Sequence, residues 1–291
     1  MQNKYIRSPL NHLGNKYRIL DIIFTNLPSM QASTKFVDVF GGSFNVGINN
    51  PFKNVIYNEY DKALFKILTY FLNTDFDIID KKINEKLEEY QLSYKKKYKE
   101  NKEKYLVIRN DYNETKDIIL LIILVFFSFN SELRFNKKDF FNVPIGKSGY
   151  TEYRRSNLIK FIELSKTKLI QTYNLDFEGL VLDLISKYKT DQIIFYFDPP
   201  YLISNATYNN NWNIDDEKRL IKILQKLNDK KYKFILSNFI KNGDVENNIL
   251  KEFLEKNKNL VIKEIHTNYK SSNYQRISKN TTEILVKNYE A

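Results

Sequence analysis

The sequence predicts an α/β fold with a mostly parallel sheet, interrupted by a mostly helical insertion. Short runs of β-branched and aromatic residues recur along the chain, which is typical of strands in a largely buried sheet. Helical patterns lie between several of these runs, as expected where crossover helices join parallel strands. From Asp61 to Arg155, strand-like runs are sparse. We therefore expect one α/β domain formed by residues 1–60 and 156–291, with residues 61–155 as an inserted domain.

Six runs are the predicted strands: Phe36–Phe40, Asn54–Tyr57, Ile193–Phe197, Lys233–Leu236, Leu260–Ile262 and Glu283–Val286. Asp215–Leu227 predicts a helix, because its apolar residues recur at helical spacing and its acidic start suits the positive end of a helix dipole. In the insertion, the apolar run Ile118–Phe127 is too short to cross a bilayer, which takes about 20 residues, so we expect a buried helix or strand there. The Lys- and Glu-rich run Tyr94–Glu103 is typical of a solvated helix face.

Composition restricts the chemistry and the partners. The chain has 291 residues, no Cys and two His, which excludes a disulfide framework, a thiol nucleophile and a Cys-ligated metal site, and argues against a metal site built from His. The formal net charge of +11 predicts a polyanionic partner, nucleic acid first, with a solvated lysine-rich surface as the alternative. Met1–Pro9 is polar and lacks an apolar signal segment, so we expect a cytoplasmic protein with no membrane partner.

A cluster of glycines directly follows the first predicted strand. Three of the eight glycines of the chain lie between Phe40 and Gly47. A glycine turn at the carboxyl end of a strand lets the backbone approach a ligand closely. The spacing is neither that of a dinucleotide fingerprint nor that of a phosphate-binding P-loop. A tight turn before a helix is the purely structural alternative.

An acidic residue, Glu59, follows the second predicted strand. At this place in an α/β sheet, a carboxylate is well placed to bond the hydroxyl groups of a ribose. Together with the glycine turn, it indicates a nucleoside-containing cofactor held without a pyrophosphate cradle. S-adenosylmethionine fits this description better than a dinucleotide. Without the glycine turn, Glu59 would be taken as an ordinary surface carboxylate.

The sequence Asp198-Pro199-Pro200-Tyr201 is the most specific motif of the chain, and it follows the predicted strand Ile193–Phe197. Two prolines cannot continue a buried strand, so they fix a rigid turn. The Asp198 carboxylate and the Pro199 carbonyl can both accept hydrogen bonds from an exocyclic amine, and Tyr201 can stack on a base. Such a setting orients the amine nitrogen and leaves its lone pair free to attack a methyl group.

These motifs, in this order, resemble the Dam-type DNA adenine-N6 methyltransferases of bacteria and phages, the D12 or α-group class. The resemblance extends over nearly the whole chain and implies a Rossmann-like S-adenosylmethionine-dependent methyltransferase fold, in which residues 61–155 form the target-recognition domain. It implies double-stranded DNA as the partner, and a cognate restriction endonuclease as a candidate second partner. It places the protein in the cytoplasm of a bacterial cell or a phage-infected host.

The resemblance also assigns roles to individual residues. It implies that Asp198, Pro199, Pro200 and Tyr201 are catalytic. The residues that it implies at the cofactor are His12, Gly14, Lys16, Asp38, Phe40, Gly41, Gly42, Ser43, Asn58, Glu59, Asp176, Phe177 and Asp198. Two of these depart from the family pattern, since His12 stands where relatives have Trp or Tyr, and Ser43 where many have Gly or another small residue.

Two segments, Phe129–Asn136 and Phe141–Lys147, are similar to the two blocks of the family's target-recognition domain. The residues implied at the DNA are Asn11, Phe129, Asn130, Arg134, Asn136, Pro144 and Lys147. In the family, the Arg matching Arg134 reads a guanine of GATC, which suits the two donors of a guanidinium, and the aromatic matching Phe129 wedges beside the flipped base. Core packing is the structural alternative for Phe129. Asn11, Glu132 and Ser148 depart from the family pattern, which leaves a target other than GATC open.

We therefore expect a site-specific enzyme that moves a methyl group from S-adenosylmethionine to N6 of a flipped-out adenine in duplex DNA. The alternatives are a cytosine-N4 methyltransferase and a catalytically inactive DNA-binding regulator of the same fold. Asp198 favours adenine, because relatives that act on cytosine N4 usually carry Ser there. The lack of Cys argues against cytosine-C5 chemistry, and the intact motif argues against the regulator.

Overall fold

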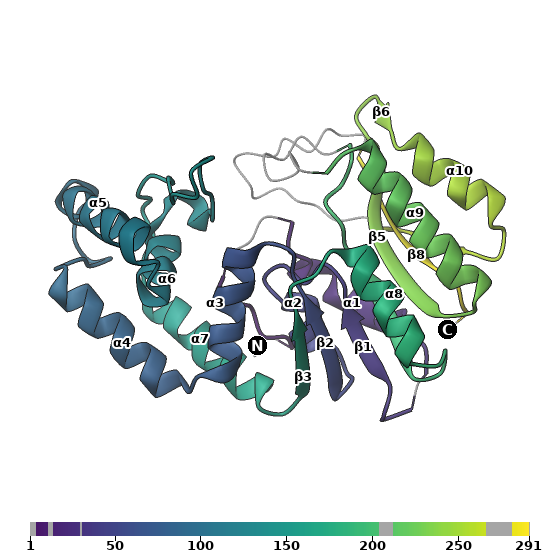
Figure 1. Cartoon of the computed structure of the whole chain (residues 1–291), viewed down its shortest axis with the longest axis horizontal. Helices are drawn as coiled ribbons and strands as arrows, with labels where there is room; N and C mark the ends of the chain where they lie inside the picture. Colours follow the sequence, from purple (N-terminus) through teal and green to yellow (C-terminus); the bar gives the residue numbers. More distant parts are fainter. Residues whose placement is uncertain (1–3, 11–13, 30, 204–211, 266–280, 291) are drawn as a thin grey trace. The chain divides into compact units, whose positions relative to one another are not determined.

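The computed structural model describes residues 4–10, 14–29, 31–203, 212–265 and 281–290 (Figure 1). The chain divides into two compact units. The first unit comprises Met1–Arg18, Gly42–Asn49 and Asp61–Asn174, and the second comprises Ile19–Gly41, Asn50–Tyr60 and Leu175–Ala291. The predicted insertion lies within the first unit, and all six predicted strands lie within the second.

A mixed sheet forms the centre of the second unit (Figure 1). Its strands are β1 (Lys35–Asp38), β2 (Asn54–Asn58), β4 (Ile193–Phe197), β5 (Lys233–Asn242), β6 (Val245–Glu246), β7 (Val261–Ile265) and β8 (Thr282–Lys287). They run in the order β2, β1, β4, β5, β8, β7. The first four are parallel, β8 is antiparallel to β5 and β7, and β6 pairs with β5. The predicted α/β fold with a mostly parallel sheet is confirmed.

Helices cover this sheet because its central strands are apolar on both faces. Every residue of β4 is buried, as expected for a parallel strand inside an α/β unit. The helices of the second unit are α1 (Leu20–Thr25), α8 (Phe177–Lys187), α9 (Ile214–Asp229) and α10 (Asn248–Lys256). α9 and α10 pack on β5, and α8 packs on α9. The predicted helix at Asp215–Leu227 is α9, which Asn213 caps, because its side chain accepts the amides of Asp215 and Asp216.

The first unit is mostly helical, as predicted for the insertion. Its elements are α2 (Asn45–Asn49), α3 (Lys62–Asn73), α4 (Phe76–Glu89), α5 (Tyr98–Thr115), α6 (Ile118–Phe127), η2 (Phe129–Ser131), α7 (Glu152–Ser165) and the strand β3 (Leu169–Tyr173). The apolar run is the helix α6, which is buried along nearly its whole length and packs against α3, α4 and α5. A helix that is apolar on all sides needs such enclosure. Asp117 caps it by accepting the amides of Ile119 and Leu120.

Several strand bounds differ from the predicted ones: β1 ends at Asp38 and not at Phe40, and β7 continues to Ile265 and not only to Ile262. β3 was not predicted, because Leu-Ile-Gln-Thr-Tyr has no buried position and no clear alternation of apolar and polar residues. β5 continues beyond the predicted end at Leu236 to Asn242, since the antiparallel strand β8 supplies hydrogen bonds to its polar second half. In the part of the chain that the structure describes, no helix is long and apolar enough to span a membrane.

Asp80 on α4 is an anchor between two helices of the first unit. Arg155 on α7 donates to both of its carboxylate oxygens, from Nε at 2.8 Å and from Nη2 at 2.9 Å, and the Tyr150 hydroxyl donates at 2.6 Å. Burial by itself would raise the pKa of Asp80. The hydrogen bonds from Arg155 and Tyr150 outweigh burial, so the pKa lies below its ordinary value.

We expect Asp80→Asn to lower the free energy of unfolding by about 1–2 kcal/mol near pH 7, because it removes charge-assisted hydrogen bonds to a partly exposed arginine. Since the folded-state pKa is depressed, this stabilisation is present above the ordinary carboxyl pKa and is lost as the pH falls through the folded-state value. Urea unfolding at about pH 7 and about pH 3 measures it. The difference between variant and wild type should shrink in acid, and a difference that is equal at both pH values would contradict the assignment. Asp77→Asn, an exposed carboxylate on the same helix, is the control.

Candidate active site and DNA-reading surface

The carboxyl ends of three neighbouring parallel strands define the candidate active site. β1 lies between β2 and β4, with Asp38 level with Tyr57 on one side and with Tyr196 on the other. The segments that follow these strands therefore begin at one edge of the sheet. They are the glycine turn after β1, Glu59 after β2 and Asp198 after β4. Open α/β sheets bind their ligands at this edge.

The turn after β1 has no room for a side chain at Gly41. The Gly41 amide donates to the Asn58 carbonyl at 2.8 Å, so the turn lies against the end of β2. A Cβ atom on Gly41 would lie 2.2 Å from Cε2 of Tyr57 and 3.0 Å from the carbonyl oxygen of Asn58. Glycine at this position keeps the backbone close to the strand ends.

Asn58 joins three segments at this edge. Its side-chain amide donates to the carbonyls of Val39 at 2.9 Å and Leu175 at 3.1 Å, and its side-chain oxygen accepts the Leu175 amide at 3.0 Å. The side chain is 1% exposed. Asn58 thus fixes the backbone around the site, whereas the neighbouring Glu59 is half-buried at the strand end.

Three aromatic rings gather beside the glycine turn. The ring centroid of Phe40 lies 5.4 Å from that of Phe177 and 5.7 Å from that of Trp212, and the last two are 5.6 Å apart. Phe177 is buried and Phe40 is half-buried. Aromatic rings at such distances attract one another and form a rigid apolar wall.

These residues fit S-adenosylmethionine. Glu59 would accept the ribose hydroxyls, and Phe40 and Phe177 would line the adenine ring. The glycine turn would bring backbone groups close to the rest of the molecule, since Gly41 carries no side chain. When bound, this cofactor supplies a methyl group on a sulfonium sulfur.

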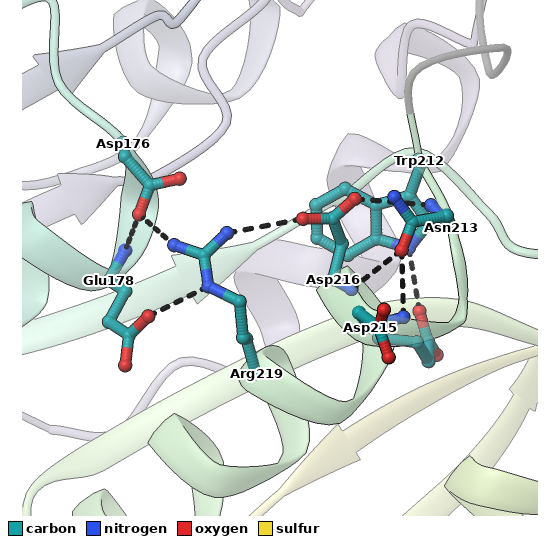
Figure 2. Close-up of polar contacts among 8 residues, drawn as sticks. Asp176, Glu178, Trp212, Asn213, Asp215, Asp216 and Arg219 are labelled. Atoms are coloured by element: carbon teal, nitrogen blue, oxygen red, sulfur yellow. Dashed lines mark hydrogen bonds and ion pairs between the residues drawn. The ribbon is translucent and has the colours of Figure 1, made fainter.

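An arginine network holds the aromatic wall of Phe40, Phe177 and Trp212 in place (Figure 2). Arg219 on α9 donates to Asp176 at 2.5 Å, to Glu178 at 2.8 Å and to Asp216 at 3.1 Å. Its guanidinium also lies 4.9 Å from the ring centroid of Phe177. The hydrogen bonds to Glu178, Asp176 and Asp216 raise the pKa of Arg219, against the opposing effect of burial. Asp176 also caps α8 by accepting the Glu178 amide at 3.0 Å, so the network fixes the starts of α8 and α9 together.

A second network holds Trp212 from the other side of the wall. The indole N–H of Trp212 donates to Glu217 at 2.8 Å, and the side-chain amides of Asn247 and Asn238 donate to the same carboxylate at 2.7 Å and 3.4 Å. Burial raises the pKa of Glu217, and the three donors oppose that rise. Glu217 is 0% exposed. It is one of the acidic residues predicted at the start of α9, so it accepts hydrogen bonds inside the unit in addition to lying near the positive end of the helix dipole.

The Asp198–Tyr201 motif, which is predicted to be catalytic, begins where β4 ends. Asp198 is half-buried, Pro199 is buried, and Tyr201 is 8% exposed. The Tyr201 hydroxyl lies 3.0 Å from Asp198 Oδ1, 3.2 Å from Ser237 Oγ and 3.0 Å from Glu283 Oε1. Burial and the two carboxylates raise its pKa well above the ordinary value, so the phenol keeps its proton.

The ring of Tyr201 packs against Phe239 of β5, with the ring centroids 4.4 Å apart. The predicted stacking of Tyr201 on a base therefore involves a ring that is already fixed by a neighbour on the sheet. A fixed ring loses little conformational entropy when a base stacks on it.

The remaining predicted cofactor residues belong to the first unit. Gly14 and Gly42 both have positive φ, 78° and 50°. The Lys16 ammonium donates to the Gly14 carbonyl at 3.2 Å, and the Ser43 hydroxyl accepts the side-chain amide of Asn45 at 2.8 Å. Their roles at the cofactor stay predictions. The predicted His12 and Asn11 lie outside the described residues.

All six predicted DNA contacts in the described part of the first unit are exposed: Phe129, Asn130, Arg134, Asn136, Pro144 and Lys147. The two predicted recognition blocks pair with each other, through a bridge between Phe135 and Phe141 and a hydrogen bond from the Phe129 amide to the Pro144 carbonyl at 2.9 Å. Phe129 is 42% exposed, which argues against the alternative that it is a core residue.

Arg134 is oriented by its neighbours. Its Nε donates to the Asn142 side chain at 3.0 Å, and its Nη1 lies 3.5 Å from a carboxylate oxygen of Glu132. The three residues present donors and acceptors side by side on an exposed surface. Base edges in the major groove are read by such groups.

A buried arginine underlies this surface. Arg154 on α7 donates to the hydroxyls of Ser131 at 2.9 Å and Ser148 at 3.2 Å, and its guanidinium lies 4.6 Å from the ring centroid of Phe126. Burial lowers its pKa to about 10, so the side chain still carries a positive charge at neutral pH. Arg154 ties the two recognition blocks to the helix behind them.

The sequence matches the D12 class N6 adenine-specific DNA methyltransferases over residues 12–271. The chain belongs to this family. It is 33% identical to modification methylase StsI of Streptococcus sanguinis over 296 residues, and 32% identical to the Type II methyltransferase M.FokI of Planomicrobium okeanokoites over 295 residues. Both alignments cover 99% of this chain and 43% of the relative, so the chain spans less than half the length of these two proteins. The DNA adenine methylase of Escherichia coli K12 is 22% identical over 245 residues, with 80% of each chain covered.

The sequence did not predict a role for three residues that support the candidate site and the exposed blocks: Arg219, Arg154 and Glu217. Arg219 lies 41 and 43 residues from its partners Glu178 and Asp176, and Arg154 lies in a stretch that only the fold brings beneath the recognition blocks. The sequence indicated Glu217 only as one of the acidic residues near the start of the predicted helix Asp215–Leu227. The only sign of the Arg219 contacts in the sequence is that the two helix segments carry opposite charges. That sign does not show that Arg219 pairs with Glu178 and Asp176 unless the fold is known.

We expect Gly41→Ala to weaken S-adenosylmethionine binding by about tenfold or more and to lower the free energy of unfolding by about 1–3 kcal/mol, because the new methyl group overlaps the Tyr57 ring. Calorimetric titration of the cofactor and urea unfolding measure the two effects. Gly179→Ala is the matched control, since a Cβ there meets nothing within 4 Å. Cofactor affinity in Gly41→Ala equal to that of the wild type would contradict this role of the turn.

Proposed function

We propose that this protein transfers a methyl group from S-adenosylmethionine to N6 of adenine in double-stranded DNA, at a specific site. The observation that carries the proposal is the Asp198–Tyr201 motif, held rigid at the carboxyl end of β4, at the sheet edge where the glycine turn and Glu59 also begin. Membership of the D12 family supports the same chemistry. The roles of single residues below are parts of this proposal.

Asp198 and Pro199 orient the amine that reacts. The Asp198 carboxylate and the Pro199 carbonyl accept the two N6 hydrogens, which turns the nitrogen lone pair toward the methyl group. Tyr201 stacks on the flipped base. No covalent bond between enzyme and base is needed, and the chain has no Cys that could form one.

DNA binding uses the charge of the chain and the exposed recognition blocks. The net charge of +11 favours phosphate contacts, which set affinity and not sequence. Arg134, with Asn142 and Glu132 beside it, reads base edges, and the exposed ring of Phe129 fills the space that the flipped adenine leaves. Flipping costs a few kcal/mol, which these contacts offset.

GATC is the first target to test, because the resemblance of Arg134 and its segment to the family's recognition block implies it, and relatives named DNA adenine methylase match 76% and 80% of this chain. The relatives named modification methylases favour a second partner, a restriction endonuclease that cuts the same site in unmethylated DNA. Together these suggest a protein that works in the cytoplasm of a bacterial cell or a phage-infected host.

Asp198→Ala should reduce methyl transfer to DNA by roughly 10²–10⁴-fold, because it removes an acceptor that orients and takes up the proton of N6. DNA binding should change little, since phosphate contacts provide most of the affinity. Transfer of labelled methyl to DNA and a fluorescence-anisotropy binding assay, run on the same preparation, separate the two. Asp215→Ala, an exposed carboxylate at the start of α9, is the control. Parallel loss of binding and transfer in Asp198→Ala would assign Asp198 a structural role instead.

Arg134→Ala should lower discrimination at one base pair of the target by about 1–3 kcal/mol. A panel of duplexes that differ at single positions measures this as the ratio of transfer rates for cognate and altered sites. Lys147→Ala is the comparison, because a lysine that bonds phosphate weakens all duplexes alike. The same uniform loss in Arg134→Ala would make Arg134 a phosphate contact.

A further inference from the structure

The buried arginine of the first unit, Arg154, pairs with no carboxylate among the described residues. It lies on α7 and is 9% exposed. Its Nη2 donates to the hydroxyls of Ser131 at 2.9 Å and Ser148 at 3.2 Å, and its guanidinium lies 4.6 Å from the ring centroid of Phe126. Its Nη1 is buried and makes no hydrogen bond within the described part of the chain. Burial lowers its pKa, and no nearby carboxylate raises it.

Stability alone does not explain an arginine at this place. Taking a charged side chain out of water costs free energy, and an apolar side chain of similar length often fills a buried site at equal or lower cost. The feature that arginine adds is a flat fork of N–H donors, which reaches two hydroxyls at once. The two hydroxyls that Arg154 bonds therefore indicate its role.

These hydroxyls belong to the two segments that carry the predicted DNA contacts. Ser131 lies within Phe129–Asn136, and Ser148 directly follows Phe141–Lys147. Ser131 is 8% exposed, so its side chain points into the unit while other residues of the same segment are exposed. Arg154 thus joins the two segments on their buried side.

The turn that presents Phe129 has an unfavourable backbone conformation. Asn130 and Ser131 both have positive φ, 54° and 55°, which residues with a Cβ atom rarely adopt. Such a conformation persists only where neighbouring groups hold it. The Phe129 amide donates to the Pro144 carbonyl at 2.9 Å on one side of the turn, and Arg154 bonds the Ser131 hydroxyl on the other. The direction of the exposed Phe129 ring therefore depends on these contacts.

We propose that Arg154 is a positioning residue for base flipping, which holds the left-handed turn at Asn130 and Ser131 and so aims the ring of Phe129 at the space that the flipped adenine leaves. This rests on the proposed function, in which Phe129 fills that space. A ring that is held in its working direction before DNA binds loses less conformational entropy when the base flips. Arg154 acts through the turn and contacts neither DNA nor cofactor.

Arg154→Met tests the proposal, because methionine fills a similar length and has no N–H donor. In single-turnover assays, the rate of methyl transfer should fall about 10- to 100-fold, as expected when a group near the chemistry is misplaced. The dissociation constant for the same duplex should change less than about threefold, since phosphate contacts provide most of the affinity. With 2-aminopurine in place of the target adenine, the fluorescence increase on binding should be several times smaller than in the wild type. Equal rates and equal fluorescence in variant and wild type would overturn the proposal.

Arg155→Met is the matched control, because it makes the same chemical change at the next residue of α7. It removes the contact with Asp80 and should lower the midpoint of urea unfolding, but the folded variant should flip and methylate at nearly the wild-type rate. Arg154→Met should show the opposite pattern, with the smaller change in midpoint and the larger change in rate. An equal loss of rate in both variants would show general packing by α7 and overturn the proposal.

Phe129→Ala shows whether Arg154 acts through the Phe129 ring. In the Phe129→Ala background, Arg154→Met should slow methyl transfer less than about twofold, because the ring that it positions is absent. The full loss in both backgrounds would contradict this route. Ser131→Ala keeps the arginine and removes the hydroxyl that it bonds, so it makes the same test if Arg154→Met does not fold. It should also slow transfer, and should do so only when Phe129 is present.

Hydrogen exchange in the free protein separates failure of this proposal from failure of the proposed function. Arg154→Met should speed amide exchange about tenfold in peptides that cover residues 128–134 and 142–149, and leave peptides of α9 unchanged. Equal exchange in variant and wild type would overturn the proposal, whether or not the protein methylates DNA. Faster exchange in a protein that methylates no adenine would refute the proposed function and the role in flipping together, and would keep Arg154 as the support of the turn.

Discussion

The alignment of three parallel strand ends is the constraint on which the rest of the site depends. The register of β1 with β2 and β4 places Asp38, Tyr57 and Tyr196 at one level. The glycine turn, Glu59 and Asp198 then leave the sheet at the same edge. Because strand side chains alternate between faces, a slip of one residue would turn each of them to the opposite face. The contact between Gly41 and Asn58 fixes this register at the place where the site begins.

Several polar side chains buried around this edge form hydrogen bonds within the protein. Asn58 bonds the backbone of two segments, Glu217 accepts three N–H groups, and Glu283 meets two hydroxyls. A satisfied network in a low-dielectric setting holds its dipoles in fixed directions. Fixed dipoles need no reorganisation when charge develops on a reacting amine, which is the largest advantage that an enzyme site has over water. The same rigidity that stabilises the edge thus prepares it for chemistry.

Much of the fold and the outline of the site could be predicted from the sequence, because both depend on local patterns. Strands such as Ile193–Phe197 are short apolar runs, and the two prolines after Asp198 mark the turn without any knowledge of the rest of the chain. The family resemblance that these motifs carried is confirmed by the match to the D12 family. Phe129 and Arg134 are both exposed, as their predicted roles at the DNA require.

The parts that sequence reasoning missed depend on contacts between distant segments. Arg219 lies 41 residues from Glu178 and 43 residues from Asp176, and Glu283, which was predicted only as part of a strand, reaches Tyr201 across 82 residues. Each of these residues is an ordinary charged residue in its local sequence. Only the packing of α8 on α9, or the antiparallel pairing of β8 with β5, brings it to the site. Strand β3 was not predicted because none of its residues is buried, so its sequence lacks the apolar pattern of a buried strand.

The most direct test of the account is to identify the base that receives the methyl group. The protein is incubated with S-adenosylmethionine that carries a deuterated methyl group and with unmethylated genomic DNA, and the DNA is then digested to nucleosides for mass spectrometry. The account predicts deuterated N6-methyldeoxyadenosine as the labelled nucleoside. Label in N4-methyldeoxycytidine, or DNA without label from a protein that binds both DNA and cofactor, would contradict it.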